Sequence, residues 1–329
     1  MRTKTMLALQ ILAPMMAVQF AVAGQQPDPK VDEVLKAARA AMGGEAALAK
    51  VQSVTVTGSA RRVMGEREMT SDVTLDLLLP DKFKRTEDMS FGGPGGPSVT
   101  RVTAVNGTDT WDDSTNRGAG GAMRFGGPGG PGGTGGQGQG QGRQFTDEDR
   151  QRMRDAQARR LKGELARYSL ILFLRTEAPV TYGGVAEAPE GKADVLEVKP
   201  EGAPAMKLYV DQATHKPLML TYDSPLPRFN FRGGPGQGQG QGQAQGQAPA
   251  QPPRPTPEEI EKMRSTPPQM ATFEVHFSEY KKVEGVMLPY LITQSVNGTV
   301  AEEFTIDKYK VNAPLKPEQF VKKGAATNN

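Results

Sequence analysis

The stretch of residues 271–320 constrains the fold most, because it contains three successive strand patterns. In the first, residues 273, 275 and 277 are apolar and alternate with polar residues, which is the period of a half-buried β-strand. A second apolar alternation covers residues 286–292. The third follows Asn297-Gly298, a dipeptide typical of tight hairpin turns. The segment therefore predicts an antiparallel meander with one apolar face.

The third strand pattern changes its phase near its end. Val300, Phe304 and Ile306 share one face, whereas Tyr309 falls out of that alternation. An extra residue in one strand of an antiparallel pair produces such a change of phase. We therefore expect a β-bulge near Asp307-Lys308.

Other apolar alternations predict strands that pair beside this meander. Residues 66–79 give the clearest alternation, with apolar residues on one face and mainly Thr and Asp on the other. The strands expected upstream of the meander cover residues 51–62, 66–79, 82–87, 99–105, 110–112, 195–198, 206–210 and 218–222. Helical spacing occurs instead in residues 31–50, interrupted by Gly43-Gly44, and in residues 146–175. The chain is therefore expected to be mainly β, within the α+β class.

Residues 1–23 have the pattern of a signal peptide. Arg2 and Lys4 precede an apolar stretch, and Ala21-Val22-Ala23 forms a small-residue cleavage site. A transmembrane helix is the alternative, but the apolar run is short and Pro14 interrupts it. We therefore expect cleavage after Ala23, a periplasmic or secreted protein, and no transmembrane segment in the mature chain.

Three low-complexity tracts interrupt the remaining sequence at residues 91–97, 118–142 and 232–257. Gly, Gln and Pro dominate them, and such tracts cannot bury enough apolar surface to offset the entropy lost on ordering. Without them, about 220 residues remain, a size that suits one β-rich domain. We therefore predict a single domain over residues 24–329 that carries three disordered insertions.

Charge and cysteine content narrow the possible partners. Without Arg2 and Lys4, 38 basic residues face 37 acidic ones, and this balance gives no reason to expect nucleic acid as a partner. The sequence contains no cysteine, so the fold must be stable in an oxidising compartment without disulfides. No lipid anchor can be attached through a cysteine either.

The sequence offers no convincing catalytic or metal-binding constellation. His215 and His276 are its only histidines, and neither lies in a zinc-binding motif. Thiol nucleophiles are excluded, and the glycines form no phosphate-binding loop. The adjacent acids Glu302-Glu303 lie in a strand, where neighbouring side chains point to opposite faces. We therefore expect no enzyme, no cofactor and no metal.

The helix expected over residues 146–175 is basic in its first half and carries an apolar stripe in its second. A solvated helix face is the simpler interpretation of the basic half. Docking to an acidic partner is the alternative.

The order of several short motifs resembles the LolA/LolB superfamily of periplasmic lipoprotein-carrier-like proteins, in particular its divergent secreted members. The motifs that carry this resemblance are LPDKFKR (79–85), VNGTDTW (105–111), LYVD (208–211), YKKVEGVMLP (280–289) and FTI (304–306). Each motif is weak alone, and their order and spacing carry the resemblance over most of the chain outside the low-complexity tracts.

The resemblance implies a strongly curved, unclosed antiparallel β-sheet, a half-barrel, with helices lining the opening of a hydrophobic cavity. Carrier members hold acyl chains in that cavity. The residues expected to line it are Met69, Val73, Leu75, Leu77, Phe83, Trp111, Phe273, Phe277, Tyr290 and Phe304. For any one of them, a plain core position is the alternative, because apolar strand faces are usually buried.

Two functions follow from this sequence. The first is a soluble periplasmic carrier that binds a lipid or an acylated protein in the cavity. The alternative is a non-enzymatic module of the cell envelope, a sensor or assembly factor with a filled interior, which binds an envelope protein through the basic helix and the flexible tracts.

Overall fold

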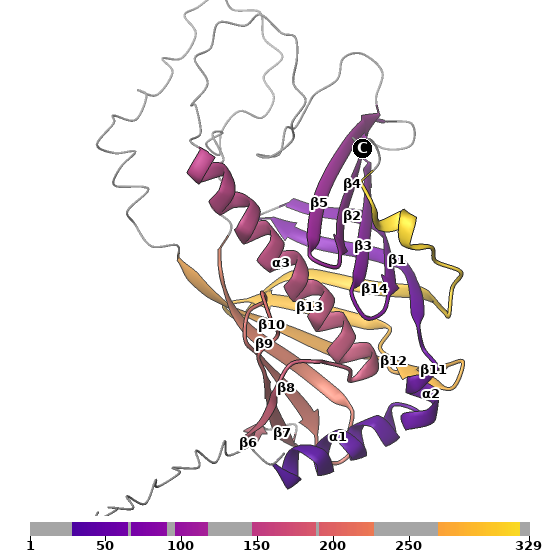
Figure 1. The fold of residues 1–329 in the computed structure, drawn as a ribbon, viewed down its shortest axis with the longest axis vertical. Coiled ribbons are helices and arrows are strands. Elements are labelled where there is room, and N and C mark those ends of the chain that lie inside the picture. Colours follow the sequence, from indigo (N-terminus) through magenta and orange to yellow (C-terminus); the bar gives the residue numbers. More distant parts are fainter. Residues whose placement is uncertain are drawn as a thin grey trace, which may run out of the picture.

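A computed structural model describes residues 28–64, 67–90, 96–117, 147–188, 191–226 and 269–322. Within these residues, twelve strands form one antiparallel sheet in the order β5-β4-β3-β2-β1-β14-β13-β10-β9-β8-β7-β6 (Figure 1). The end strands β5 and β6 do not pair with each other, so the sheet is not closed. The predicted mainly β, unclosed antiparallel architecture is confirmed.

The sheet consists of two meanders that β14 joins. β1 pairs with β2 and β14, and β14 pairs in turn with β13. The strands are β1 (Ser53–Met64), β2 (Arg67–Leu78), β3 (Lys82–Ser90), β4 (Ser98–Asn106), β5 (Asp109–Arg117), β6 (Val180–Ala188), β7 (Gly191–Val198), β8 (Met206–Asp211), β9 (Pro217–Pro225), β10 (Met270–Ser278), β13 (Leu291–Val296) and β14 (Thr299–Val311). The last long strand of the chain therefore lies at the centre of the sheet.

Helix α3 (Asp147–Phe173) crosses one face of the sheet, which curves around it (Figure 1). We call this face the inner face and the opposite one the outer face. The helices α1 (Pro29–Ala41) and α2 (Glu45–Ala49) are separated by the predicted break at Gly43-Gly44. Arg175, just after α3, donates hydrogen bonds to the carbonyl oxygens of Leu48 and Val51, which fixes the end of α3 beside α2.

The predicted bulge near Asp307 is present and explains the phase change in β14. In the pairing of β1 with β14, Thr57 lies opposite Lys308 and Gly58 lies opposite Ile306, so Asp307 is the extra residue. A β-carbon on Gly58 would lie 2.1 Å from the carbonyl oxygen of Thr305. Only glycine allows the two backbones to approach this closely at the bulge.

Replacing Gly58 by Ala is expected to lower the free energy of unfolding by about 1–3 kcal/mol, because the backbone around Thr305 must move. Urea denaturation measures the loss. Gly183→Ala in β6 is the matched control, because its nearest neighbours are side-chain atoms of Glu197 and Val195 at 3.2 Å, which can shift. Similar losses in the two variants would contradict this account of Gly58.

The structure differs from the strand predictions at two places. The expected strand over residues 286–292 is divided at Pro289: β12 (Val286–Leu288) pairs with β11 (Lys281–Val283) in a separate two-stranded sheet, and β13 begins at Leu291. Strand β6 was not predicted, because Gly183-Gly184 suggests a turn. The β6–β7 register shifts between Tyr182 and Gly184, so these glycines mark a bulge.

Several sequence predictions concern residues outside the described ranges. They are the signal peptide and its cleavage after Ala23, the tracts at 118–142 and 232–257, and most of the tract at 91–97. They remain predictions, as does the single-domain boundary.

Candidate functional site

The inner face of β1, β2 and β3 carries an apolar surface around Leu75, Leu77 and Phe83. The strand register places Val54 beside Leu77 and Val56 beside Leu75, and it pairs Leu77 with Phe83 on the next strand. Leu75, Leu77 and Phe83 have no exposed surface. The regular alternation of β2 therefore directs one complete set of apolar side chains toward α3.

Nine of the ten predicted cavity residues belong to this face or its margin. Val73, Leu75, Leu77, Phe83, Phe277 and Phe304 are buried, and Met69, Phe273 and Tyr290 are half-buried. Phe273 stacks on Tyr222 of β9 with ring centroids 5.1 Å apart, and Tyr290 meets Tyr309 edge to face at 5.4 Å. The two meanders thus contribute to one surface.

Trp111 lies on the outer face and does not join this set. It pairs with Ala104, whereas the residue of β4 that pairs with Phe83 is Val105, so Trp111 and Phe83 face opposite sides. Its indole nitrogen donates a 2.7 Å hydrogen bond to the carbonyl oxygen of Phe320, in the 3-10 turn η1 (Pro317–Phe320). Trp111 therefore holds the C-terminal turn against the outer face, and we remove it from the cavity residues.

The second half of α3 fills the space over the inner face. Tyr168 stacks on Phe83 with ring centroids 5.7 Å apart, and Ile171, Leu172 and Phe173 have no exposed surface. These side chains belong to one core cluster with the apolar residues of the strands. In this structure the inner face is therefore packed against α3.

A charged cluster lies within this otherwise apolar interface. Arg85 contacts Glu87 on the same strand and Glu302 on β14, where the closest nitrogen–oxygen distance is 3.0 Å. Arg62 on β1 contacts the same two glutamates, at 2.5 Å and 2.6 Å. The two arginines and two glutamates balance in charge. Gly58, Ala60 and Ser71 are the small inner-face residues in this region of β1 and β2, and they leave room for the long charged side chains.

The electrostatics of the cluster favour its charged form. Burial alone would raise the pKa of Glu87, but the charges of Arg85 and Arg62 outweigh burial and lower it to about 2. Burial opposes ionisation of Glu302 as well, and the same arginines lower its pKa. The glutamates consequently remain ionised at neutral pH, and each depends on the arginines to compensate for lost hydration.

Unsatisfied polar atoms concentrate at the contact between α3 and the sheet. Among the described residues, four buried side-chain polar atoms have no hydrogen-bond partner: Ser71 Oγ, Glu164 Oε2, Arg167 Nε and Ser169 Oγ. Three belong to α3, and Ser71 belongs to the inner face. Each such atom costs about 1–3 kcal/mol relative to a hydrated state. The α3 contact is therefore less favourable than its apolar area alone suggests.

Arg167 connects α3 to the second meander. It donates a 2.9 Å hydrogen bond to the side chain of Gln294 on β13 and a 3.4 Å hydrogen bond to Tyr222. Arg85 and Arg167 therefore give α3 and the inner face a polar centre between apolar regions.

The sequence analysis missed this polar centre, although a signal for it exists. Arg85 and Glu87 follow Phe83 at steps of two, and Glu302 precedes Phe304 by two, so all three charges fall on the apolar side of their strands. Charged residues in phase with the buried face of a strand mark such a cluster.

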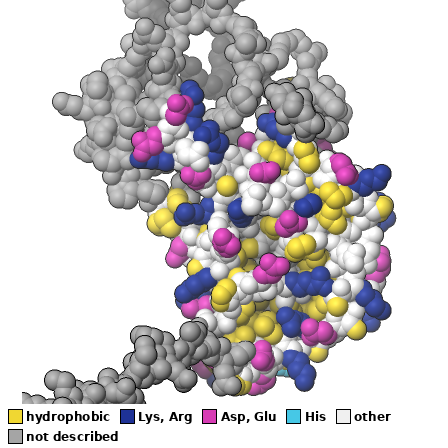
Figure 2. Space-filling view, viewed as in Figure 1, with side chains coloured by type: hydrophobic (Ala, Val, Ile, Leu, Met, Phe, Trp, Pro, Cys, Tyr) yellow, Lys and Arg dark blue, Asp and Glu magenta, His cyan; other side chains and the backbone are white. Residues whose placement is uncertain are grey.

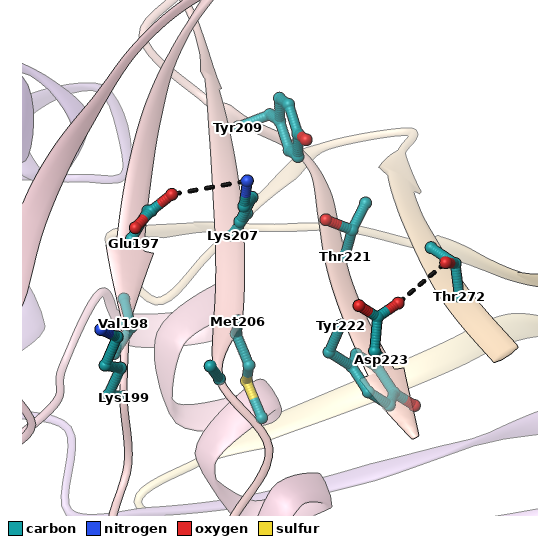
Figure 3. A pocket seen from close by; sticks show the side chains of 11 residues that line it. Glu197, Val198, Lys199, Met206, Lys207, Tyr209, Thr221, Tyr222, Asp223 and Thr272 are labelled. Atoms are coloured by element: carbon teal, nitrogen blue, oxygen red, sulfur yellow. Dashed lines mark hydrogen bonds and ion pairs between the residues drawn. The ribbon is translucent and has the colours of Figure 1, made fainter. Parts of the chain in front are cut away.

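A hollow of about 330 Å³ is lined by residues of β7, β8 and β9 and by Thr272 of β10 (Figure 3). Its polar groups bind one another: Lys207 pairs with Glu197 at 3.4 Å, and Thr272 donates a 2.8 Å hydrogen bond to Asp223. Because these groups are already satisfied, this hollow is a weaker candidate than the inner face.

In the described part of the chain, no three His, Asp or Glu side chains lie close enough together to hold a metal ion. None of the helices there combines the length and the apolar composition needed to cross a membrane.

No protein-family model and no curated protein matches the sequence. The solved structures that are similar to the chain include the following three. A Vibrio parahaemolyticus domain named for outer membrane lipoprotein sorting is 12% identical with a TM-score of 0.41, and the match covers 88% of this chain and 94% of that one. The LolA superfamily protein NE2245 from Nitrosomonas europaea is 10% identical with a TM-score of 0.39, covering 88% and 97% of the two chains. A DUF1329 family protein from Desulfovibrio piger is 11% identical, with the same TM-score and coverage.

Proposed function

We propose that this protein is a periplasmic or secreted, non-enzymatic carrier that holds a lipid or an acylated protein between α3 and the inner face. The observation that carries the proposal is the contact itself, which combines an apolar sheet face with a cover that leaves polar atoms unsatisfied. The sequence resemblance to the LolA/LolB superfamily supports the same class of ligand.

The energetics of the contact favour exchange of α3 for an acyl chain. Leu75, Leu77 and Phe83 bind α3 through apolar contact alone, and an alkyl chain supplies the same contact at about 0.8 kcal/mol per buried methylene. When α3 moves away, Glu164, Arg167 and Ser169 regain water. A ligand that replaces α3 thus keeps the apolar contacts and removes the cost of the unsatisfied atoms, while the hydrogen bonds from Arg167 to Gln294 and Tyr222 are exchanged for water.

Cysteine labelling tests this exchange, because the sequence contains no cysteine of its own. We expect the thiol of Leu75→Cys to react faster than the protein unfolds globally, since movement of α3 exposes it. A fluorescent fatty-acyl probe should bind the parent protein, and at saturation it should slow this reaction because the chain covers the same residue.

Ala104→Cys is the matched control. Ala104 has no exposed surface but lies on the outer face, near Trp111 and the turn η1. Its thiol should react only as fast as global unfolding allows, with or without the probe. Absence of probe binding, together with labelling of Leu75→Cys only at the rate of global unfolding, would rule out the carrier.

An envelope interaction module is the second candidate, and the packing of α3 on the inner face favours it. The first half of α3 projects past the sheet and displays charges of both signs (Figure 2). Arg150 pairs with Asp147 and Arg152 with Glu148 on this exposed surface, so part of the basic charge is compensated within the helix. The labelling result that rules out the carrier would leave this module as the function.

A further inference from the structure

The interface between α3 and the inner face contains more positive than negative charge. Its positive side chains are Arg62, Arg85, Arg101, Arg160 and Arg167, and its negative side chains are Glu87, Asp112, Glu164 and Glu302. Arg62 and Arg85 share two of the glutamates, and Arg167 lies 4.0 Å from Glu164. Among the described residues, no carboxylate lies within 4 Å of the guanidinium groups of Arg101 or Arg160.

The register and the helical spacing place these two arginines on facing elements, β4 and α3. Arg101 on β4 pairs with Glu87 and with Ser114, so it faces the inner side next to the charged cluster. Arg160 precedes Glu164 by four residues and Arg167 by seven, so it shares the α3 stripe that meets the sheet. α3 passes close to β4 and β5, at one end of the sheet. Both arginines are exposed there, at the edge of the contact between α3 and the sheet.

The two positive charges act on each other. Partial desolvation and the charge of Arg160 lower the pKa of Arg101, while Glu87 and Asp112 oppose this effect. Glu87 is already bound by Arg62 and Arg85, and Asp112 forms no ion pair with Arg101. Repulsion between two guanidinium groups is relieved when an anion binds between them.

Apolar surface adjoins these arginines. Met89 on β3 pairs with Val99 on β4, one inner-face position beyond the Glu87–Arg101 pair. Met89 and Val99 are half-buried, as is Met69 on β2. A ligand with an anionic group at the arginines can therefore extend its apolar part along the inner face.

We propose that Arg101 and Arg160 form a phosphate-binding site at the margin of α3, and that the phosphate is the headgroup of an anionic amphiphile. This amphiphile part rests on the proposed carrier function. Guanidinium groups bind phosphate oxygens in bidentate geometry, and arginine suits such a site better than lysine. A phosphate monoester carries a charge of about −1.5 to −2 near neutral pH, which matches two arginines without carboxylate partners.

The test compares three probes on the parent and on the double variant Arg101→Gln/Arg160→Gln. The probes are a short-chain fluorescent phosphatidic acid, the diacylglycerol with the same chains, and inorganic phosphate measured by calorimetry. We expect phosphatidic acid to bind the parent at least tenfold more tightly than diacylglycerol. The double variant should lose this preference while its affinity for diacylglycerol stays the same. Both arginines are exposed, so the variant is expected to fold.

Arg159→Gln is the matched control, because Arg159 is an exposed arginine next to Arg160 but turned about 100° around the helix. It should leave all affinities unchanged. Equal binding of the two lipids by the parent, or an equal loss with Arg159→Gln, would overturn the phosphate site while leaving the carrier in place.

The inorganic phosphate measurement separates the two proposals. If neither lipid binds but phosphate binds and is lost in the double variant, the arginine site stands with free phosphate as its ligand, and the carrier function fails. If no probe binds, both proposals are overturned.

Discussion

Arg85→Met is expected to lower the free energy of unfolding by about 3–5 kcal/mol, the range for removal of one partner from a buried ion pair. Arg85 is 6% exposed and contacts both Glu87 and Glu302. Met fills a similar volume, so the lost stability comes mainly from the two carboxylates, which retain only Arg62 as a charge partner. Urea denaturation at neutral pH measures the change.

The matched control adds Glu87→Gln and Glu302→Gln to the Arg85→Met variant. Neutral amides need no charge partner, so this triple variant should recover part of the lost stability. A loss below about 1 kcal/mol for Arg85→Met alone, in the range of exposed ion pairs, would mean that the cluster is hydrated.

The pH dependence of the parent follows from the same cluster. The folded-state pKa of Glu87, about 2, lies below its ordinary value of 4.5. The stabilisation from Glu87 is therefore fully present above about pH 5 and is lost as the pH falls toward 2. In Arg85→Met, the part of the free energy of unfolding that is lost between pH 5 and pH 2 should be smaller than in the parent. Denaturation curves of the two proteins measured between pH 2 and pH 6 give this difference.

Phe83→Ala is the second change with a large expected effect, a loss of about 3–5 kcal/mol in the free energy of unfolding. Phe83 has no exposed surface and stacks on Tyr168, so its removal leaves a cavity directly between α3 and the sheet. Under the carrier proposal, this weaker contact should also increase the affinity for the fluorescent acyl probe, because less energy is needed to displace α3.

Phe320→Ala is the control for Phe83→Ala. Phe320 is equally buried but belongs to the turn η1 on the outer face, where its carbonyl oxygen accepts the hydrogen bond from Trp111. It should cost comparable stability without a change in probe affinity. Probe affinities that change equally in the two variants would show that general destabilisation, rather than release of α3, governs binding.

Much of the sheet could be predicted from its alternation of apolar and polar residues. The β2 pattern and the Asn297-Gly298 turn indicate which strands run side by side, and the phase change at Tyr309 indicates the bulge. Strand β6 was missed because it is an edge strand that buries no side chain fully, which leaves little hydrophobic signal.

The side chains on the inner face could be predicted wherever a strand has a clear apolar phase. Trp111 was misplaced because β5, the other edge strand, has no apolar alternation to show which side faces inward. The packing of α3 on this face could not be predicted either, since an apolar stripe on a helix does not identify the surface that it covers.

The charged cluster escaped prediction for a different reason. An isolated Arg or Glu in a strand is normally assigned to solvent, because burying one charge without a partner is unfavourable. Arg85 and Glu302 are brought together by the central pairings of β14 and are more than 200 residues apart in sequence. The phase of each charge places it on the buried side of its strand, but which strands meet across such a separation is not contained in any local pattern.

The central place of β14 also has a consequence for how the chain folds. Strands β1–β5 form by hairpins between neighbours in sequence, and so do β6–β9, but Val54 can pair with Val311 only after almost the whole chain has been made. Contacts between such distant residues slow folding, because loop closure precedes any gain from pairing. Until β14 pairs with them, β1 and β13 have unpaired edges, and these edges can pair with strands of other chains. A newly synthesised chain is therefore most vulnerable to aggregation in the interval before its last strand pairs.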